Sequence, residues 1–182
     1  MLVRYLPAYI ILSTCLRRVV TATIWKLHMK IASLLMLTAS LLLTGCATVD
    51  MAPKAESEKA KEFRPPSANN AAVYIYRNSF GGQALKKDIW VDGKCIGESA
   101  NNVFFLTEVE GGKTHKFDTE SEFSANTLEI TTDAGKNYFL RQYIKMGVFV
   151  GGAGLEQMSE EAGKADVAKL DLALQGKCSA PR

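Results

Sequence analysis

The chain has 182 residues, of which 47% are hydrophobic and 23% are charged, and its formal net charge is +3. The excess of positive over negative charge comes from the first 45 residues, which contain five basic side chains and no acidic one. Once these five are set aside, 17 of the 22 Lys and Arg remain against 19 Asp and Glu, a formal charge of −2. The larger part of the chain therefore lacks the basic balance of a nucleic-acid-binding protein, and we exclude nucleic acid as a partner.

Residues 29–45 have the order of a secretory signal peptide. Lys30 supplies a positive charge and Ile31–Leu43 is an apolar run that ends in small residues. A signal peptide needs a cationic start, an apolar core of about 7–15 residues and small side chains before the cleavage site. The apolar core is too short for a membrane-spanning helix, which needs about 20 residues.

The end of this stretch, Leu43-Thr44-Gly45-Cys46, resembles the lipobox of bacterial lipoproteins. The resemblance implies cleavage between Gly45 and Cys46 and a diacylglycerol on the Cys46 thiol. An ordinary signal peptidase site, or a buried cysteine, is the alternative. Each buried acyl methylene contributes about 0.8 kcal/mol, so the two or three chains of such a lipoprotein anchor it permanently in the membrane. Because Ala47 stands where an inner-membrane lipoprotein has aspartate, the resemblance implies the outer membrane of a Gram-negative cell, on its periplasmic side.

Residues 1–28 precede a signal peptide that is complete in itself, with its own start at Met29-Lys30. We interpret them as an upstream extension that an early start codon adds. A second interpretation is a long basic n-region on the cytoplasmic side. A third is a membrane helix over Leu2–Leu27, which Arg17-Arg18 interrupts.

Residues 46–70 contain the lipidated cysteine and a stretch rich in Ala, Lys, Glu, Pro and Asn. So few bulky apolar side chains do not bury enough surface to offset the entropy of ordering, which predicts a flexible, disordered tether. A short helix over Lys54–Lys61 would end before Pro65-Pro66. As a random coil, about 24 residues reach roughly 25–30 Å from the membrane.

From residue 71 the chain changes to short apolar runs separated by turn residues. Period-two alternation and β-branched or aromatic residues predict strands at 72–77, 88–91, 94–98, 102–106, 114–119, 127–131 and 137–144, with a further candidate at 155–158. Asp92-Gly93 is a hairpin signal, and Ser159 is the candidate N-cap of a helix over Glu160–Leu170. The pattern predicts an all-β fold, a single antiparallel β-sandwich of about seven or eight strands with a short C-terminal helix. We place this domain at 71–175 and a tail at 176–182.

The order of four motifs resembles one bacterial family. The motifs are Val73-Tyr74-Ile75-Tyr76-Arg77, Trp90-Val91-Asp92-Gly93-Lys94-x-Ile96-Gly97, Glu110-Gly111-Gly112-Lys113-x-His115 and Ala134-Gly135-Lys136-x-Tyr138. Together they resemble the envelope lipoproteins of the domain of unknown function 2846 family, over about residues 71–172. Two of the motifs are also similar to PEGA-type repeats, which are small Ig-like or prealbumin-like β-sandwiches. The resemblance implies a location and a fold, and it implies no activity.

Cys95 and Cys178 are the two cysteines beyond the predicted anchor. An oxidising periplasm permits a disulfide between them, which would fasten the tail to the domain. Two unpaired thiols are the alternative, because a sequence does not give the separation of the two β-carbons. His115 is the only histidine beyond residue 45 and no Cys-x-x-Cys motif occurs, so we expect no metal site and no cofactor.

Asp118, Glu120 and Glu122 alternate along one predicted strand and are candidates for acid–base or calcium chemistry. Residues at i, i+2 and i+4 share one face of a strand, so a solvated face is the simpler interpretation. The sequence contains no Ser/His/Asp, Cys/His or metal-ligand set. We therefore predict no catalytic residues and no enzymatic activity.

Val148, Phe149 and Val150 place three bulky apolar residues between glycines, just past the longest predicted strand. They either complete that strand and cap the core, or form an apolar loop tip that contacts a partner protein or the membrane surface.

The sequence predicts a membrane-anchored periplasmic lipoprotein that acts as a binding or structural module of the envelope, with an envelope protein as its candidate partner. An envelope hydrolase acting on glycan or peptide is an alternative, which a pocket with convergent carboxylates of perturbed pKa would favour. Partner recognition by β-augmentation is another, which an exposed edge strand free of lysine, proline and bulges would favour. The oligomeric state does not follow from the sequence.

Overall fold

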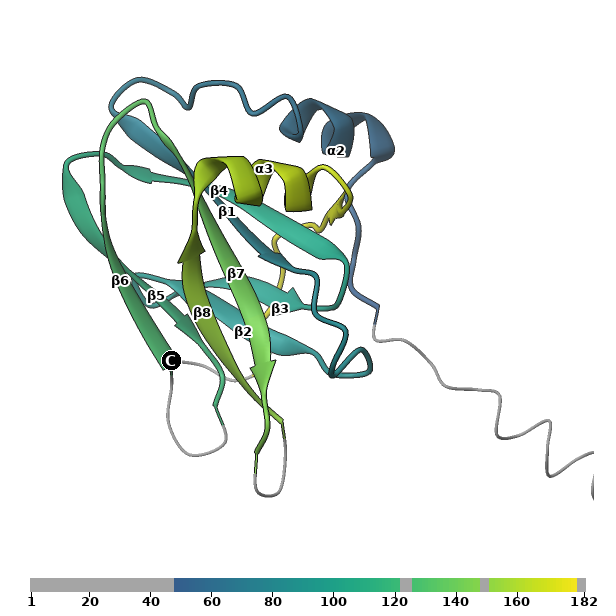
Figure 1. Cartoon of the computed structure of the whole chain (residues 1–182). Helices are drawn as coiled ribbons and strands as arrows, with labels where there is room; N and C mark the ends of the chain where they lie inside the picture. The colour runs from purple at the N-terminus through teal and green to yellow at the C-terminus, as the bar shows by residue number, and fades with distance from the viewer. Residues whose placement is uncertain (1–47, 122–125, 148–150, 180–182) are drawn as a thin grey trace, which may run out of the picture. The chain divides into compact units, whose positions relative to one another are not determined.

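Two β-sheets that share one core form most of the fold, as the computed structural model shows for residues 48–121, 126–147 and 151–179 (Figure 1). The strand order is β8-β7-β1-β4-β9 in the first sheet and β3-β2-β5-β6 in the second. The strands are β1 (Asn70–Arg77), β2 (Lys87–Val91), β3 (Lys94–Ser99), β4 (Val103–Glu110), β5 (Lys113–Thr119), β6 (Asn126–Thr132), β7 (Asn137–Lys145), β8 (Gly152–Met158) and β9 (Asp171–Leu172). The helices of the described part are α2 (Lys54–Ala60) and α3 (Glu160–Val167). The predicted all-β sandwich is confirmed, with nine strands in place of seven or eight.

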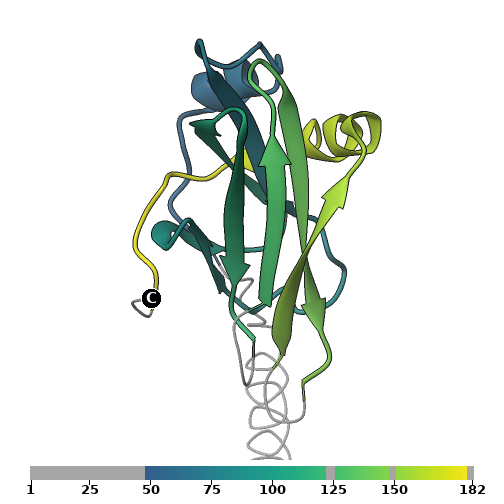
Figure 2. The same cartoon turned by 90° about the vertical axis from the view of Figure 1, so that its left-hand side faces the viewer.

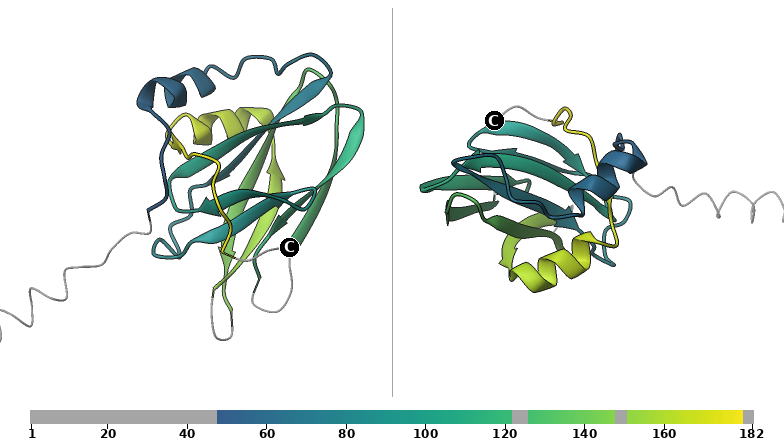
Figure 3. Two further views of the ribbon diagram at one scale, coloured as in Figure 1. Left: turned by 180° about the vertical axis from the view of Figure 1, so that it is seen from behind. Right: turned by 90° about the horizontal axis from the view of Figure 1, so that it is seen from above.

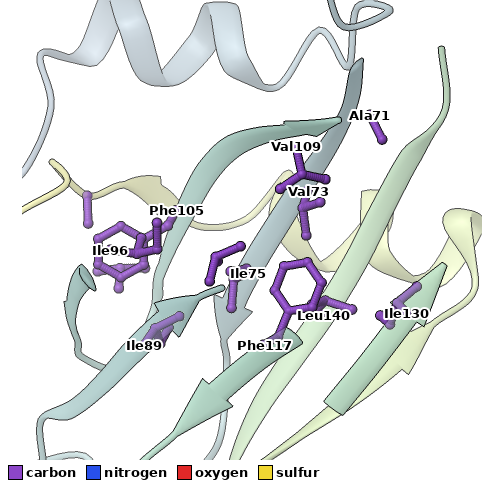
Figure 4. Close-up of a cluster of buried hydrophobic side chains, with 13 residues drawn as sticks. Ala71, Val73, Ile75, Ile89, Ile96, Phe105, Val109, Phe117, Ile130 and Leu140 are labelled. Carbon is purple, nitrogen blue, oxygen red and sulfur yellow. The ribbon is translucent and has the colours of Figure 1, made fainter. Parts of the chain in front are cut away.

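The core between the sheets is built from alternate residues of the strands. Val73 and Ile75 of β1 pack in one cluster with Ile89 of β2 and Phe117 of β5, and all four are fully buried. Figure 4 shows these side chains in the space between the sheets. The other members are Ala71, Val91, Ile96, Val103, Phe105, Val109, Ile130, Leu140 and Ala173. Because burial of one large apolar side chain contributes about 1.5–3 kcal/mol, this cluster decides which face of each strand points inward.

Strand β1 is buried on both faces, because the outer side of the first sheet is covered as well. Tyr74 and Tyr76 belong to a second cluster, which also contains Phe139 of β7 and Val167 of α3. The ring of Phe63 lies over this cluster, 5.3 Å from the ring of Tyr74 and 5.7 Å from that of Phe139. Both helices lie along this side of the sheet (Figure 1). The sandwich therefore carries a third, partial layer of helices and aromatic side chains.

Helix α3 begins at the predicted residue and lies very close to β7. The Oγ of Ser159 accepts a hydrogen bond from the Ala162 N–H at 3.3 Å, so Ser159 is the N-cap. The Tyr76 hydroxyl donates to the Asp166 carboxylate at 2.9 Å. A Cβ atom added to Gly163 would lie 2.2 Å from Cγ of Phe139. The helix reaches this depth because residue 163 has no side chain.

The prediction of a purely antiparallel sandwich is wrong for two strand pairs. β1 runs parallel to β7, with Ala72 opposite Asn137, and β4 runs parallel to β9. The pairs that are adjacent in sequence, β2 with β3 and β5 with β6, are antiparallel. Asp92 and Gly93 both have positive φ, 51° and 77°, as the predicted type I′ turn requires. Turn residues determine the pairing of strands that follow each other in sequence. The pairing of β1 with β7 instead depends on tertiary packing, because both strands contribute side chains to the inner and to the outer cluster.

The prediction of a disordered tether over residues 46–70 is wrong from residue 48 on. Ser57 of α2 is 1% exposed, and its hydroxyl accepts a hydrogen bond from the Leu172 N–H at 3.0 Å. The Ala52 N–H donates to the Leu172 carbonyl at 2.9 Å. Backbone pairing with β9 and one aromatic ring on the outer cluster order this segment. Composition does not reveal either of them, because neither requires a run of apolar side chains.

The predicted tail over 176–182 belongs to the domain as far as Ser179. Cys95 of β3 and Cys178 form a disulfide. The N–H and the hydroxyl of Ser179 both donate to the buried Asp88 carboxylate, each at 2.7 Å. Figure 3 shows the tail, in yellow, passing beside the second sheet. A bridge between residues 83 positions apart contributes about 2–4 kcal/mol by restricting the unfolded chain.

The two ends of the described chain cover one pair of sheet edges. Met51 pairs with Ala173 next to β9, and the Gly176 N–H donates to the Ile96 carbonyl of β3 at 2.9 Å. At the other side of the sandwich β6 and β8 lie next to each other, as Figure 2 shows. β8 begins at Gly152, three residues before the predicted start. All four edge strands of the described part therefore have chain of the same protein beside them along part of their length.

Replacing Gly163 with alanine is expected to lower the free energy of unfolding by about 1–3 kcal/mol, because a methyl group in a packed contact forces side chains or backbone to move. The gain in helix propensity, about 1 kcal/mol, offsets part of this loss. Urea unfolding measures the difference.

Gly81→Ala is the matched control, because a Cβ atom at Gly81 meets nothing within 4 Å. It is expected to change the free energy of unfolding by less than about 0.5 kcal/mol. Equal stability of the two variants would contradict the close approach of α3 to β7.

Candidate functional site

A groove of about 310 Å³ lies between α2 and the outer face of the first sheet. Its apolar floor consists of Ala72, Tyr74, Leu106 and Leu172. Its charged rim consists of Glu56, Lys59, Arg64 and Glu108, and Pro65-Pro66 form part of a wall. This volume is at the lower end of the range for small-molecule sites, about 300–1,000 Å³. The sequence analysis missed the groove because it placed α2 and the prolines in a tether.

The titratable groups at the groove are held by hydrogen bonds. The Glu108 carboxylate accepts from the Ser67 hydroxyl, from the Ser67 N–H at 3.1 Å and from the Asn70 side-chain amide at 3.1 Å. The hydrogen bond from the Ser67 hydroxyl is the main reason that the pKa of Glu108 lies below 4.5. The Tyr74 hydroxyl donates to the Ala60 carbonyl at 3.1 Å, and burial raises the pKa of Tyr74 to about 12. The shifts of both groups lead away from neutral pH, so neither Glu108 nor Tyr74 is poised to exchange a proton there.

His115 forms a buried link between two turns. Its Nδ1 lies 2.6 Å from the Asp92 carboxylate and its Nε2 lies 2.8 Å from the Glu110 carbonyl oxygen. Both partners are acceptors, so both ring nitrogens donate when the imidazole is protonated. The Lys116 N–H donates to the second Asp92 oxygen at 2.8 Å.

These contacts shift both pKa values of the pair. Burial by itself lowers the pKa of His115, but the hydrogen bonds to Asp92 and to the Glu110 carbonyl raise it more, so it lies above 6.5. Desolvation acts to raise the pKa of Asp92, and the hydrogen bonds from the Lys116 N–H and from His115 outweigh it, so this pKa lies below 3.8. The pair is therefore ionised over the mildly acidic range, and it ties the β2–β3 turn to the β4–β5 turn.

The interpretation of Asp118, Glu120 and Glu122 as a solvated face is wrong for Asp118. Its side chain is buried, 2% exposed, and it accepts a hydrogen bond from the Thr127 hydroxyl. Glu120 is half-buried with an oxygen 3.9 Å from Nζ of Lys87, and Glu122 lies outside the described residues. Within the described ranges no group of three or more His, Cys, Asp or Glu is placed to hold a metal ion.

A chain of buried polar side chains links the two sheets. The Ser99 hydroxyl donates to the side-chain carbonyl of Gln142, whose amide donates to the Thr119 hydroxyl at 2.7 Å. The Thr119 hydroxyl donates to the Asp88 carbonyl at 2.9 Å. Buried polar groups with partners on both sides orient the strands that carry them, and nothing here approaches the surface. The sequence signal for this chain is Gln142, a glutamine at an inward position of β7.

The remaining predicted sites differ in what the structure says of them. It joins Cys95 to Cys178. Gly45 and Cys46, the predicted cleavage and lipidation site, lie outside the described residues, as do Val148, Phe149 and Val150. In the part that is described, no helix has the length and hydrophobicity needed to cross a membrane.

Two comparisons place the chain among known proteins. Residues 67–153 match the family described as Protein of unknown function (DUF2846). A Haemophilus influenzae protein named only as an uncharacterized protein is 58% identical over 135 residues, which covers 74% of this chain and 80% of that protein. The chain belongs to the DUF2846 family. No solved structure matches it.

The DUF2846 match covers the sandwich but not its outer layer. It begins at Ser67, beside the groove, and ends at Ala153, the second residue of β8. It contains β1 and β4, which supply most of the groove floor. Helices α2 and α3, strand β9 and Cys178 lie beyond it. The wall of the groove and one partner of the disulfide, Cys178, thus lie outside the matched DUF2846 region, whereas Cys95 lies inside it.

We predict that an NMR titration of His115 gives a pKa above 6.5, and that Asp92→Asn brings this pKa down because the carboxylate is lost. Asparagine tolerates the positive φ of residue 92, so the turn is kept. An equal pKa in the two proteins would contradict the link between the turns.

The same pair makes stability depend on pH. A raised pKa of His115 means that its contribution is complete below the unfolded pKa of about 6.5 and is lost as the pH rises through the folded pKa. The contribution of Asp92 is lost at the other end, as the pH falls below 3.8 through its lowered folded pKa. Because the Asp92 side chain is 50% exposed, the ion pair contributes on the order of 1 kcal/mol or less.

Proposed function

We propose that this DUF2846 protein is a lipoprotein of the cell envelope, cleaved after Gly45 and anchored through lipid on Cys46. The lipobox Leu43-Thr44-Gly45-Cys46, at the end of a short apolar run that follows Lys30, carries the proposal. Ala47, in place of aspartate, favours the outer membrane. The domain then acts in the periplasm, as a binding or structural module, with an envelope protein as its candidate partner.

The disulfide supports an extracytoplasmic location. Cys95 and Cys178 are bonded to each other, and such bonds form and persist in oxidising compartments such as the bacterial periplasm. Reducing enzymes keep thiols free in the cytosol, where structural disulfides are rare. The bond also holds the tail across the edge of the second sheet, so the folded domain depends on the compartment in which it matures.

The groove under α2 supports a binding role over catalysis. A glycan or peptide hydrolase needs a carboxyl group whose pKa is raised so that it donates a proton. At the groove the pKa of Glu108 is lowered by the hydrogen bond from Ser67, and Glu56 lies on the exposed side of α2. An apolar floor with charges of both signs at the rim suits an elongated, partly apolar ligand. The likeness of two sequence motifs to PEGA-type repeats, which are small Ig-like or prealbumin-like sandwiches, favours the same role.

Cys46→Ser tests the anchor. The wild-type protein, produced in a Gram-negative host, is expected to incorporate labelled palmitate and to begin at residue 46 with a lipid-modified cysteine by mass spectrometry. The variant is expected to lose the label completely, because serine has no thiol to accept diacylglycerol, and to keep its uncleaved leader.

Ser40→Ala is the matched control, because it changes one small side chain of the same apolar run outside the lipobox. It is expected to leave labelling and cleavage unchanged. Normal processing of the Cys46→Ser protein would overturn the proposal.

Strand β6 favours a second candidate function, partner recognition by β-augmentation. It contains neither lysine nor proline and pairs with β5 without a register shift. The neighbouring edge strand β8 reaches the second sheet near its start, where the Ala153 N–H donates to the Glu120 carbonyl at 2.9 Å. The Asn126 side chain at the start of β6 also donates to the Ala153 carbonyl, so a partner strand would pair along the later residues of β6.

A photo-crosslinking residue at Glu129 of β6 tests this second function in cells. It is expected to give adducts with an envelope protein, whereas the same residue at Lys94, the first residue of β3 after the β2–β3 turn, is expected to give none. Both positions are exposed, so access to the crosslinker is matched. Absence of adducts at Glu129, or equal adducts at the two positions, would rule out β6 as the recognition edge.

A further inference from the structure

Two apolar side chains are almost entirely exposed at one end of the sandwich. Phe80, in the loop between β1 and β2, is 95% exposed, and Met146, directly after β7, is fully exposed at 101%. Both follow strands that run in the same direction, because β1 and β7 are parallel neighbours. The two residues therefore leave the first sheet at the same end. Single exposed apolar residues are ordinary, but two at one end of one sheet need an explanation.

The loops that carry these residues are packed against each other. A Cβ atom added to Gly82 would lie 2.9 Å from Cγ1 of Ile144, and one added to Gly151 would lie 2.8 Å from Cδ1 of Leu85. The buried Arg77 side chain donates to the Leu85 carbonyl at 2.8 Å and to the Gly82 carbonyl. The β1–β2 loop is thus held in place by hydrogen bonds from Arg77 and by close packing against Ile144 and Gly151 of the β7–β8 hairpin. Phe80 and Met146 are presented by one supported surface, which we call the loop face.

The described chain begins beside the end of the β1–β2 loop, the loop that carries Phe80. Thr48 lines a pocket of about 130 Å³ together with Lys86, the last residue of the β1–β2 loop, and with Leu174 and Lys177 of the tail. Leu174 is also among the exposed apolar residues. Cys46 precedes Thr48 by two residues, and an extended chain spans at most about 3.6 Å per residue. The Cα atoms of residues 46 and 48 therefore lie within about 7 Å of each other.

We infer that the loop face rests on the bilayer, with the side chains of Phe80 and Met146 inserted among the lipids. The inference rests on the proposed function, because lipid on Cys46 is what brings the bilayer to this surface. A lipid anchor so close to the first folded residue holds the neighbouring surface against the headgroups, whereas a long flexible tether would not. Aromatic and thioether side chains suit the boundary between headgroups and acyl chains. Lys177, which is exposed beside Thr48, supplies a cation at the level of the lipid phosphates.

Docking of this kind fixes the orientation of the domain. The lipid alone would leave the domain free to rotate about one attachment point. Two inserted side chains on separate loops add two further contacts, and three points define a plane. Because the lipid anchor already holds the domain at the bilayer, the effective concentration of the loop face at the membrane is high. Weak contacts between the two side chains and the lipids are then sufficient.

The inference is tested by tryptophan fluorescence in the complete, lipid-modified protein. Phe80→Trp and Met146→Trp each place a reporter on the loop face, and Lys136→Trp is the control. Residue 136 lies in the β6–β7 turn, whose Gly135 N–H donates to Asn70 at the opposite end of β1. Each protein is reconstituted in phosphatidylethanolamine and phosphatidylglycerol vesicles with and without bromine on the acyl chains. Trp90 is buried, so its signal in the unsubstituted protein serves as the common background and shows that each variant is folded.

The brominated lipid is expected to quench about half or more of the added fluorescence of Phe80→Trp and Met146→Trp, because inserted rings reach the acyl boundary. The Lys136→Trp signal is expected to stay unquenched. Mass spectrometry of the Cys46 peptide from the same samples separates the outcomes. A lipid-modified protein with all three reporters unquenched overturns the docking, leaves the anchor intact and assigns the loop face to a protein partner. An unmodified Cys46 overturns the proposed function and the docking together.

Discussion

Neither face of strand β1 is exposed to solvent. Its residues from Ala71 to Arg77 are all buried, with Val73 and Ile75 on the inner side and Tyr74 and Tyr76 on the outer side. A strand of this kind is stable only between two apolar layers. The second sheet supplies the inner layer. Phe63, α3 and the segment around α2 supply the outer one, which is why segments before β1 and after β8 are part of the fold.

The same requirement brings both ends of the chain onto the sheets. The segment that carries α2 pairs with β9, and the tail is bonded to β3 through Cys95 and Cys178. These contacts cover sheet edges that would otherwise offer unpaired backbone groups to other chains. The described chain consequently begins at Thr48, only two residues after Cys46 in the sequence. In the lipoprotein that we propose, this length holds the domain at the membrane surface rather than far into the periplasm.

The polar groups of the domain serve its architecture more than any reaction. Gln142 and its hydroxyl partners connect the sheets, His115 and Asp92 connect two turns, and Glu108 holds the chain before β1. The carboxylates of these last two arrangements have lowered pKa values, because hydrogen bonds favour their charged form. In the function that we propose, the groove under α2 is then a surface for binding. This agrees with a proposed role as a module that is positioned, rather than as an enzyme.

Much of this protein follows from its sequence alone. The strands, the Asp92-Gly93 turn and the Ser159 cap depend on patterns within a few neighbouring residues, and such patterns act locally. The tertiary structure alone decided the parallel pairing of β1 with β7, the order of residues 48–70, and the burial of Asp118. It also decided that Phe80, an aromatic residue of an ordinary loop, stays outside. Each of these features depends on which segments pack against each other. The free energy of such packing comes from contacts between two segments, so neither segment's own sequence reveals it.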